Sequence, residues 1–236
     1  MSRISLVQLA GSVRKFNLNR PFISPILSTV HCFSMCLQVV KRSPNCTLMN
    51  EIKSFANGAY KSLPRAGPDR GFQRAVVRLL DEWKGEGTTL TDLGCGSGEY
   101  VAFINTLGWV AHGFDGNPMT PTLVPGHTHY ANLSKALVSP SEWVLSLEVG
   151  EHIPPKFEDA FLANVTSNAK SKIIMSWAIP GQGGPGHVNE QPVEYIVDKM
   201  RTLGWVPDWT ETSWVRKSCF LHWLRNNIVV YTPNVC

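Results

Sequence analysis

Short apolar runs alternate with amphipathic stretches along the chain from residue 69 onward. The runs that predict β-strands cover residues 90–93, 109–114, 129–133, 143–147, 172–179 and 228–231. Residues 71–84 and 154–168 instead place apolar side chains at the spacing of one helix face. Alternating strands and helices predict an α/β domain with a Rossmann-like, doubly wound sheet, which is mostly parallel and carries helices on both faces.

Three glycines at alternate positions follow the strand predicted at 90–93. They are Gly94, Gly96 and Gly98, and a helical pattern begins directly after them. A strand that turns straight into a helix directs backbone N–H groups at whatever lies above the turn, and glycine lets a ligand approach the backbone closely. The segment therefore predicts a nucleotide- or nucleoside-binding turn. A dinucleotide fingerprint would need glycine where Glu99 stands, and a P-loop would need a Gly-Lys pair that the turn lacks.

A carboxylate ends the second predicted strand. Asp115 stands directly after the apolar residues 109–114. A carboxylate at this strand tip can accept hydrogen bonds from both hydroxyls of a ribose. Its spacing from the glycine turn suits NAD as well as S-adenosylmethionine, and the alternative is an exposed aspartate in an Asp-Gly-Asn-Pro turn.

The pattern D-x-G-x-G-x-G at residues 92–98 resembles motif I of the class I S-adenosylmethionine-dependent methyltransferases. The resemblance implies that the loop, with Cys95 inside it, packs against the methionine part of the cofactor. It also implies that Asp92 helps to organise the loop and the ammonium group. In this family the last strand, here 228–231, inserts antiparallel beside the fifth.

Two further segments extend the resemblance. Residues 143–155 end in Glu-Val-Gly-Glu-His-Ile-Pro-Pro and resemble motif IV of the family, which implies that Glu148 and Val149 line the cofactor pocket while Glu151 and His152 lie at its mouth. Residues 129–133 resemble the third strand, whose end carries an Asp-Leu pair near the adenine. Here the pair is Asn132 and Leu133, and the amide of Asn132 can still hydrogen-bond the adenine edge. Few residues separate strands two and four, so the helix usual there must be short or missing.

The string His-Val-Asn-Glu-Gln-Pro at residues 187–192 resembles a subgroup of small-molecule-type methyltransferases. His187 is the first candidate for accepting a proton from the methyl acceptor, and His152 is the second, because a neutral imidazole takes a proton near physiological pH. The alternatives are a loop-anchoring role for His187, a turn role for His152 and helix capping by Asn189.

Charge divides the chain into two parts. Residues 1–50 hold six basic and no acidic residues, whereas residues 51–236 hold 16 basic against 18 acidic ones, a net charge of −2. The first part has the composition of a presequence or an extended leader, and the second is the expected methyltransferase domain. The domain carries no basic patch, so no nucleic-acid partner is expected. Polar residues interrupt the apolar stretch 22–40, so no stable membrane span is expected, and nothing indicates an oligomeric state.

A mitochondrial or cytoplasmic location is expected, and a secretory one is less favoured, because a glycan on the Asn132 sequon would block the adenine side. The six cysteines have neither metal-ligand nor disulfide spacing, and His127 with His129 lacks further ligands, so no metal site is predicted. The function expected is transfer of a methyl group from S-adenosylmethionine to oxygen or nitrogen of a small molecule. The alternatives are a protein acceptor, an NAD-dependent oxidoreductase (disfavoured by Glu99) and a non-catalytic binding protein with the same fold.

Overall fold

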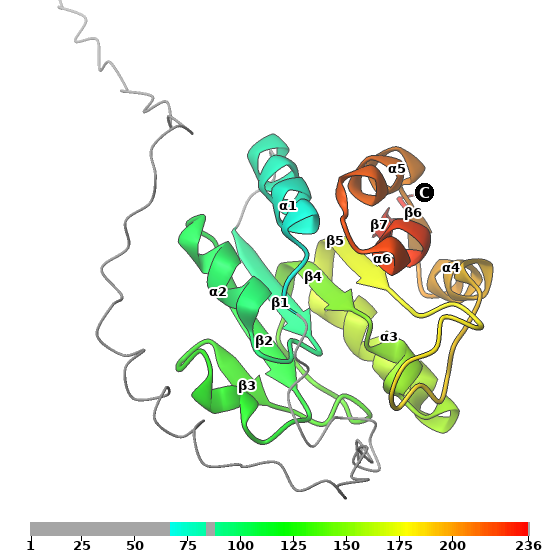
Figure 1. Cartoon of the computed structure of the whole chain (residues 1–236), viewed down its shortest axis with the longest axis horizontal. Helices are drawn as coiled ribbons and strands as arrows, with labels where there is room; N and C mark the ends of the chain where they lie inside the picture. The colour runs from blue at the N-terminus through cyan, green and yellow to red at the C-terminus, as the bar shows by residue number, and fades with distance from the viewer. Residues whose placement is uncertain (1–66, 84–87, 236) are drawn as a thin grey trace, which may run out of the picture. The chain divides into compact units, whose positions relative to one another are not determined.

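The computed structural model describes residues 67–83 and 88–235. The prediction of a separate leader at residues 1–50 lies outside these residues. Seven strands form one sheet in the order β3-β2-β1-β4-β5-β7-β6 (Figure 1). Their bounds are β1 Thr89–Leu93, β2 Val110–Asp115, β3 Thr128–Tyr130, β4 Ser141–Leu147, β5 Ala169–Ser176, β6 Trp205–Pro207 and β7 Val229–Pro233.

The first five strands run parallel, and β7 inserts antiparallel between β5 and β6. This arrangement confirms the predicted fold class, including the antiparallel strand beside the fifth. The strand order reverses between β1 and β4, which both leave the sheet at its carboxyl edge. In open α/β sheets, ligands bind in the crevice at such a switch point.

Helices cover both faces of the sheet (Figure 1). Their bounds are α1 Arg70–Glu82, α2 Glu99–Thr106, α3 Glu158–Asn168, α4 Val193–Thr202, α5 Trp209–Ser218 and α6 His222–Asn227. Alternate strand residues separate into two buried clusters. Trp143 and Leu145 of β4 pack with α1, α2, α5 and α6 on one face, while Val144 packs with α3 and α4 on the other. No helix in the described ranges is both long and apolar enough to cross a bilayer.

Asp69 caps the start of α1 and also bonds the segment that links α5 to α6. One carboxylate oxygen of Asp69 accepts hydrogen bonds from the N–H groups of Gly71 and Phe72 at 2.7 and 2.9 Å. The other oxygen accepts from the N–H groups of Phe220 and Leu221 at 2.7 and 2.6 Å. Capping of this kind satisfies N–H groups that a helix leaves unpaired, and here it also fixes the link between α5 and α6.

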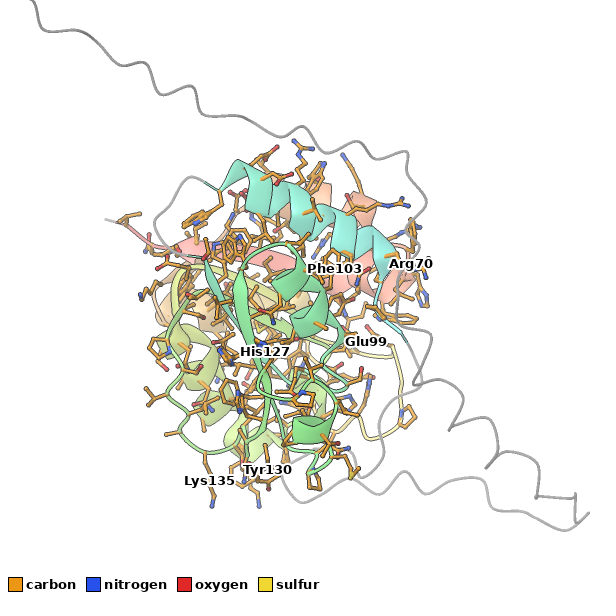
Figure 2. The ribbon with its side chains drawn as sticks, turned by 90° about the vertical axis from the view of Figure 1, so that its left-hand side faces the viewer. Arg70, Glu99, Phe103, His127, Tyr130 and Lys135 are labelled. Carbon is orange, nitrogen blue, oxygen red and sulfur yellow. The ribbon has the colours of Figure 1, made fainter. Side chains whose placement is uncertain are left out.

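The strand at the edge of the sheet, β3, is shorter than the sequence predicts. Figure 2 faces this side of the molecule, with His127 just before the short strand and Tyr130 at its end. The strand ends at Tyr130, because Asn132 turns the chain by accepting hydrogen bonds from the N–H and the hydroxyl of Ser134. The prediction of a strand at 129–133 was therefore too long at its carboxyl end. Between β2 and β4 the only helical segment is the 3₁₀ turn η2, Thr120–Thr122, which confirms that the helix expected between these strands is short or missing.

Candidate functional site

A cavity of about 540 Å³ opens at the carboxyl edge of the central strands. Its wall combines the glycine turn after β1, the end of β2, the segment after β4, the loop after β5 and the start of α6. The predicted site residues that line it are Asp92, Gly94, Cys95, Gly96, Asp115, Leu133, Glu148, Val149, His152 and His187. Residues far apart in the sequence thus meet at one place, and the volume suits small-molecule ligands.

Two of the predicted cofactor-binding residues do not line this cavity. Gly98 caps α2 with a left-handed φ of 76°, and a Cβ there would lie 2.7 Å from the side chain of Thr128. Its role in the structure is close packing of the turn against the β3 segment. Asn132 uses its side-chain oxygen in the turn with Ser134, while its neighbour Leu133 lies on the cavity wall.

The N–H groups of the glycine turn are largely used inside the protein. Those of Gly94 and Cys95 donate to the carbonyl of Phe114 at 2.7 and 3.2 Å, and that of Gly96 donates to Asp115 Oδ2 at 2.9 Å. The N–H of Gly98 donates to the carbonyl of Cys95 at 2.8 Å. The expectation that this turn directs its N–H groups at a ligand is therefore wrong for these four. A turn with its donors used in this way is poorly suited to a phosphate.

Two carboxyl groups lie beside the turn and make its surroundings acidic. Asp92 is buried, and its Oδ2 has no hydrogen-bond partner among the described residues. Burial, together with the charge of Asp115, raises the pKa of Asp92 to about 8. Burial also raises the pKa of Asp115, although hydrogen bonds from the N–H groups of Asn117 and Gly96 oppose that effect. A cation above the turn would pair with these groups, whereas a pyrophosphate would be repelled.

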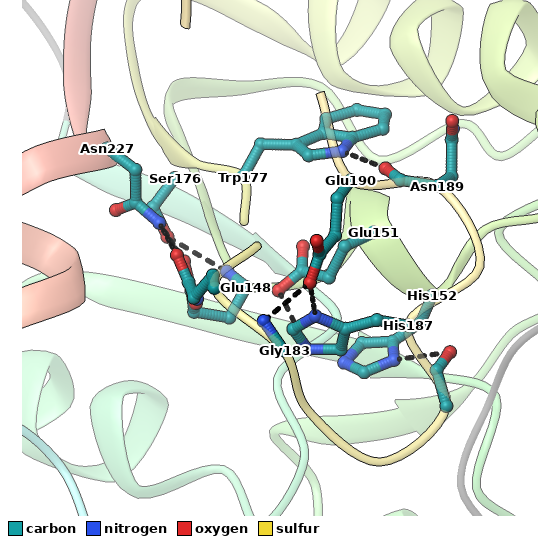
Figure 3. Close-up of polar contacts among 12 residues, drawn as sticks. Glu148, Glu151, His152, Ser176, Trp177, Gly183, His187, Asn189, Glu190 and Asn227 are labelled. Atoms are coloured by element: carbon teal, nitrogen blue, oxygen red, sulfur yellow. Dashed lines mark hydrogen bonds and ion pairs between the residues drawn. The ribbon is translucent and has the colours of Figure 1, made fainter. Parts of the chain in front are cut away.

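Glu148 lies on the next part of the cavity wall, and its own backbone conformation is strained. Its φ of 55° is in the left-handed region, which a non-glycine residue adopts only where the surroundings enforce it. Three side chains hold its carboxylate. Ser176 and Asn227 donate to Oε1 at 2.8 and 2.7 Å (Figure 3). Gln182 donates to Oε2 at 2.5 Å. These bonds connect β4, β5, the loop after β5 and α6 at the cavity.

His152 and His187 come together at the same wall, with ring centroids 4.9 Å apart (Figure 3). The Nδ1 of His187 lies 2.7 Å from Glu190 Oε1, and its Nε2 lies 3.9 Å from Glu151 Oε1. Burial lowers the pKa of His152 to about 4, so this ring is neutral at physiological pH. Burial raises the pKa of the Cys95 thiol, which also lines the cavity, and this keeps the thiol protonated.

Helix capping by Asn189 is not what the structure shows. The helix α4 begins after Pro192 without a side-chain cap. Asn189 is buried instead. Its side-chain amide donates to Glu158 Oε2 at 2.9 Å, and its backbone carbonyl accepts from the indole N–H of Trp177 at 2.6 Å. The segment 187–192 is therefore anchored to β5 and α3.

The oxidoreductase alternative would call for a Tyr-x-x-x-Lys pair in the site. The sequence contains one, Tyr195 and Lys199, but neither residue lines the cavity. The hydroxyl of Tyr195 donates to Glu158 Oε1 at 2.7 Å, and the ammonium of Lys199 lies 2.8 Å from Asp159 Oδ1. Both side chains serve contacts between α4 and α3.

Several lining residues carry no sequence signal of their own. Gln182 and Gly183 belong to the glycine-rich loop after β5, and residues 221–224 come from the start of α6. The helix α6 leads directly into β7, which runs antiparallel beside β5. Asn227, the last residue of α6, donates to Glu148, and no pattern in the sequence marks it as part of the site.

Similar solved structures share this architecture. Magnesium protoporphyrin IX methyltransferase from Synechocystis PCC 6803, with S-adenosylmethionine bound, superposes with a TM-score of 0.52 at 17% identity over 69% of this chain and 80% of its own. A TehB-like S-adenosylmethionine-dependent methyltransferase from Corynebacterium glutamicum gives 0.52 at 16% identity over 71% and 90% of the two chains.

A third similar structure is an amino pentose methyltransferase of calicheamicin biosynthesis from Micromonospora echinaspora, with S-adenosylmethionine bound. It gives a TM-score of 0.52 at 14% identity over 72% of this chain and 93% of its own. The fold is that of class I methyltransferases. No protein-family model matches the sequence, and no curated protein matches it. At these identities the likeness establishes the fold, and function rests on the chemistry of the cavity.

Proposed function

We propose that this protein is an S-adenosylmethionine-dependent methyltransferase that acts on an oxygen or nitrogen atom of a small molecule. The observation that carries the proposal is the acidic glycine turn. Its N–H groups bond within the protein, and the buried Oδ2 of Asp92 has no partner in the described ranges. S-adenosylmethionine, when bound, supplies a methyl group on a positively charged sulfonium together with a cationic ammonium, so its charges suit this turn. NAD would instead place two phosphates beside Asp92 and Asp115.

The residues present fit such a cofactor. Asp92 would face its cationic part, Asp115 retains acceptor capacity for ribose hydroxyls, and Leu133 and Val149 offer apolar surface for the adenine and the chain. A Cβ at Gly94 would lie 2.2 Å from Val149 Cγ2, so glycine is required where the two segments approach. These residues bind and orient. Their role would be to hold the cofactor so that its methyl group can be aligned with an acceptor, because alignment is the main contribution that an enzyme makes to this displacement.

The acceptor would enter on the side of Glu148, His152 and His187. A hydroxyl or amine acceptor loses a proton when it is methylated. His187 has its Nδ1 bonded to Glu190, which leaves the Nε2 lone pair for that proton. The surrounding loop and α6 limit the space, which favours a small molecule over a protein side chain. The expected class of activity is EC 2.1.1.-, and the acceptor can be sought by screening metabolite extracts with methyl-labelled cofactor.

Calorimetric titration separates the two cofactor classes. The full-length protein should bind S-adenosylmethionine and S-adenosylhomocysteine at one saturable site and should give no binding heat with NAD. Heat with NAD and none with S-adenosylmethionine, in a protein that melts cooperatively, would reverse the assignment. Competition between the two adenosyl compounds should show that they share the site.

Replacing Asp115 with alanine should weaken S-adenosylhomocysteine binding by about 1–3 kcal/mol, because hydrogen bonds from ribose hydroxyls to a charged acceptor are lost. Asp115 also holds the N–H groups of Gly96 and Asn117, so the variant can act through the loop as well. A 2′-deoxy analogue of the ligand separates the two causes. The wild type should discriminate against the analogue and the variant should not. Equal discrimination by both proteins would remove the ribose role.

A further inference from the structure

Three potential metal ligands meet at the wall of the cavity. Glu151 and His152 lie in the 3₁₀ turn η3, Gly150–His152, which begins three residues after the end of β4, and His187 lies in the loop after β5. One donor atom from each residue lies within 4.8 Å of the other two. Figure 3 shows the carboxylate of Glu151 beside the two imidazole rings.

The carboxylate of Glu151 is the unusual member of this group. The residue is 0% exposed, and no hydrogen bond of ordinary geometry reaches either of its oxygens from the part of the chain that the structure describes. A buried carboxylate without partners is costly, and a bound cation is the usual compensation.

The two histidines are held as metal-binding histidines are held. His187 Nδ1 lies 2.7 Å from Glu190 Oε1, and Glu190 is itself fixed by the N–H groups of Gly181 and Gly183 at 2.8 Å each. His152 Nδ1 lies 3.1 Å from the carbonyl oxygen of Gly186, which can only accept. Both contacts assign the proton to Nδ1 and the lone pair to Nε2. Ligating histidines commonly donate their second nitrogen to a carboxylate or a backbone carbonyl in this way.

We propose that Glu151, His152 and His187 bind a divalent transition-metal ion. One carboxylate and two imidazoles suit Mn²⁺, Fe²⁺, Co²⁺ or Zn²⁺, and three ligands leave coordination positions open toward the cavity. Sequence spacing predicts no metal here, because the ligands come from two loops that only the fold brings together. Binding of the ion does not depend on the methyltransferase assignment.

The role of the ion within the site does rest on the proposed function. An oxygen of the acceptor would complete the coordination, and the ion would make a hydroxyl there lose its proton to solvent more easily. That oxygen would then form the bond to the methyl carbon while the bond from carbon to sulfur breaks and S-adenosylhomocysteine leaves. His187 then serves as a ligand, because one lone pair on Nε2 cannot hold both a metal and a proton. The substrate class that follows is an acceptor with a hydroxyl or carboxylate oxygen able to reach the ion.

Metal titration of the full-length protein tests the site. After treatment with EDTA and removal of the chelator, the protein is titrated with Mn²⁺, whose free form is measured by electron paramagnetic resonance, and with Co²⁺, followed by its visible absorption. Mn²⁺ is chosen because it prefers oxygen and nitrogen to thiolates, so cysteines should not compete. One saturable site per chain is expected. Failure of both ions to bind saturably would overturn the proposal.

Variants locate the ion. Glu151→Gln and His187→Gln should each weaken Mn²⁺ binding by about 100-fold or more, because even the groups that orient ligands account for roughly 10–100-fold. His129→Gln is the matched control, since His129 lies in a separate histidine cluster 3.2 Å from His112 and should retain full affinity. Unchanged affinity in both site variants, or loss in His129→Gln alone, would place the ion elsewhere. Thermal melting verifies folding, and if Glu151→Gln does not fold, His187→Gln decides.

Calorimetry with S-adenosylmethionine on the metal-free protein keeps the two proposals separate. Cofactor binding without any metal site leaves the methyltransferase proposal intact and removes the metal proposal. A metal site without cofactor binding leaves the metal proposal intact and removes the methyltransferase proposal.

Discussion

Replacing Gly94 with alanine should lower the free energy of unfolding by about 2–5 kcal/mol and remove measurable S-adenosylmethionine binding. Two effects add. Gly94 has φ +86°, a left-handed conformation that costs an L-residue about 1–2 kcal/mol. The new Cβ would also lie 2.2 and 2.7 Å from the two methyl groups of Val149, and such overpacking costs about 1–3 kcal/mol. Relief of the clash must move the turn or Val149, and both line the cavity.

Gly108 offers a control matched in backbone strain. Its φ is +88°, and a Cβ there would meet nothing within 4 Å. Gly108→Ala should therefore lower the free energy of unfolding only by the cost of backbone strain and should keep cofactor binding. The clash is tested by pairing Gly94→Ala with Val149→Ala, which removes both methyl groups. Urea unfolding should then give a favourable coupling of about 0.5–3 kcal/mol. Purely additive effects would show that Val149 is not what Gly94 must accommodate.

Local patterns in the sequence predicted the central part of the fold and of the cavity. Apolar runs predict the existence of strands where both faces are buried, as in β4 and β5, although the predicted range 172–179 begins and ends three residues later than the observed β5. Asp115 could be found because a strand end determines where its side chain lies. The short strand β6, Trp205–Pro207, was missed, since three residues carry too little pattern. The third strand was extended too far because Asn132 forms a turn, a choice that depends on the hydroxyl of Ser134.

Contacts between distant segments could not be predicted in the same way. The spacing of the glycines does not reveal that the N–H groups of Gly94 and Cys95 bond the carbonyl of Phe114 in the neighbouring strand. Nor does any local pattern reveal that Asn227, near the end of the chain, donates to Glu148. The glycine motif suggested a surface of free N–H donors, whereas contacts with the end of β2 use these donors and leave the carboxyl groups of Asp92 and Asp115 beside the turn. This difference favours a cation over a phosphate as the ligand of the turn.

Replacing Asp92 with asparagine should stabilise the ligand-free protein while weakening S-adenosylmethionine binding. The pKa of Asp92 is about 8 in the folded protein and 3.8 as its ordinary value. A carboxyl group with a raised pKa contributes most to stability below pH 3.8, and that contribution is lost as the pH rises toward 8. Asparagine does not ionise in either state. The advantage of Asp92→Asn should therefore grow between pH 5 and pH 8, by on the order of 1 kcal/mol per pH unit.

Asp92→Asn should weaken cofactor binding, because the variant loses the negative charge that faces the cation. The expected loss of binding free energy is about 1.5–3 kcal/mol, the value of a hydrogen bond to a charged group. At pH 7 the wild-type carboxyl is mostly protonated, so a bound cation should expel its proton. Calorimetry in buffers of different ionisation enthalpy should detect proton release in the wild type and less in Asp92→Asn. Asp81→Asn, on the exposed face of α1, should change stability by less than about 0.5 kcal/mol at either pH. If Asp92→Asn is destabilised at pH 8, or binds the cofactor as the wild type does, the buried carboxyl is part of the scaffold and does not bind the methyl donor.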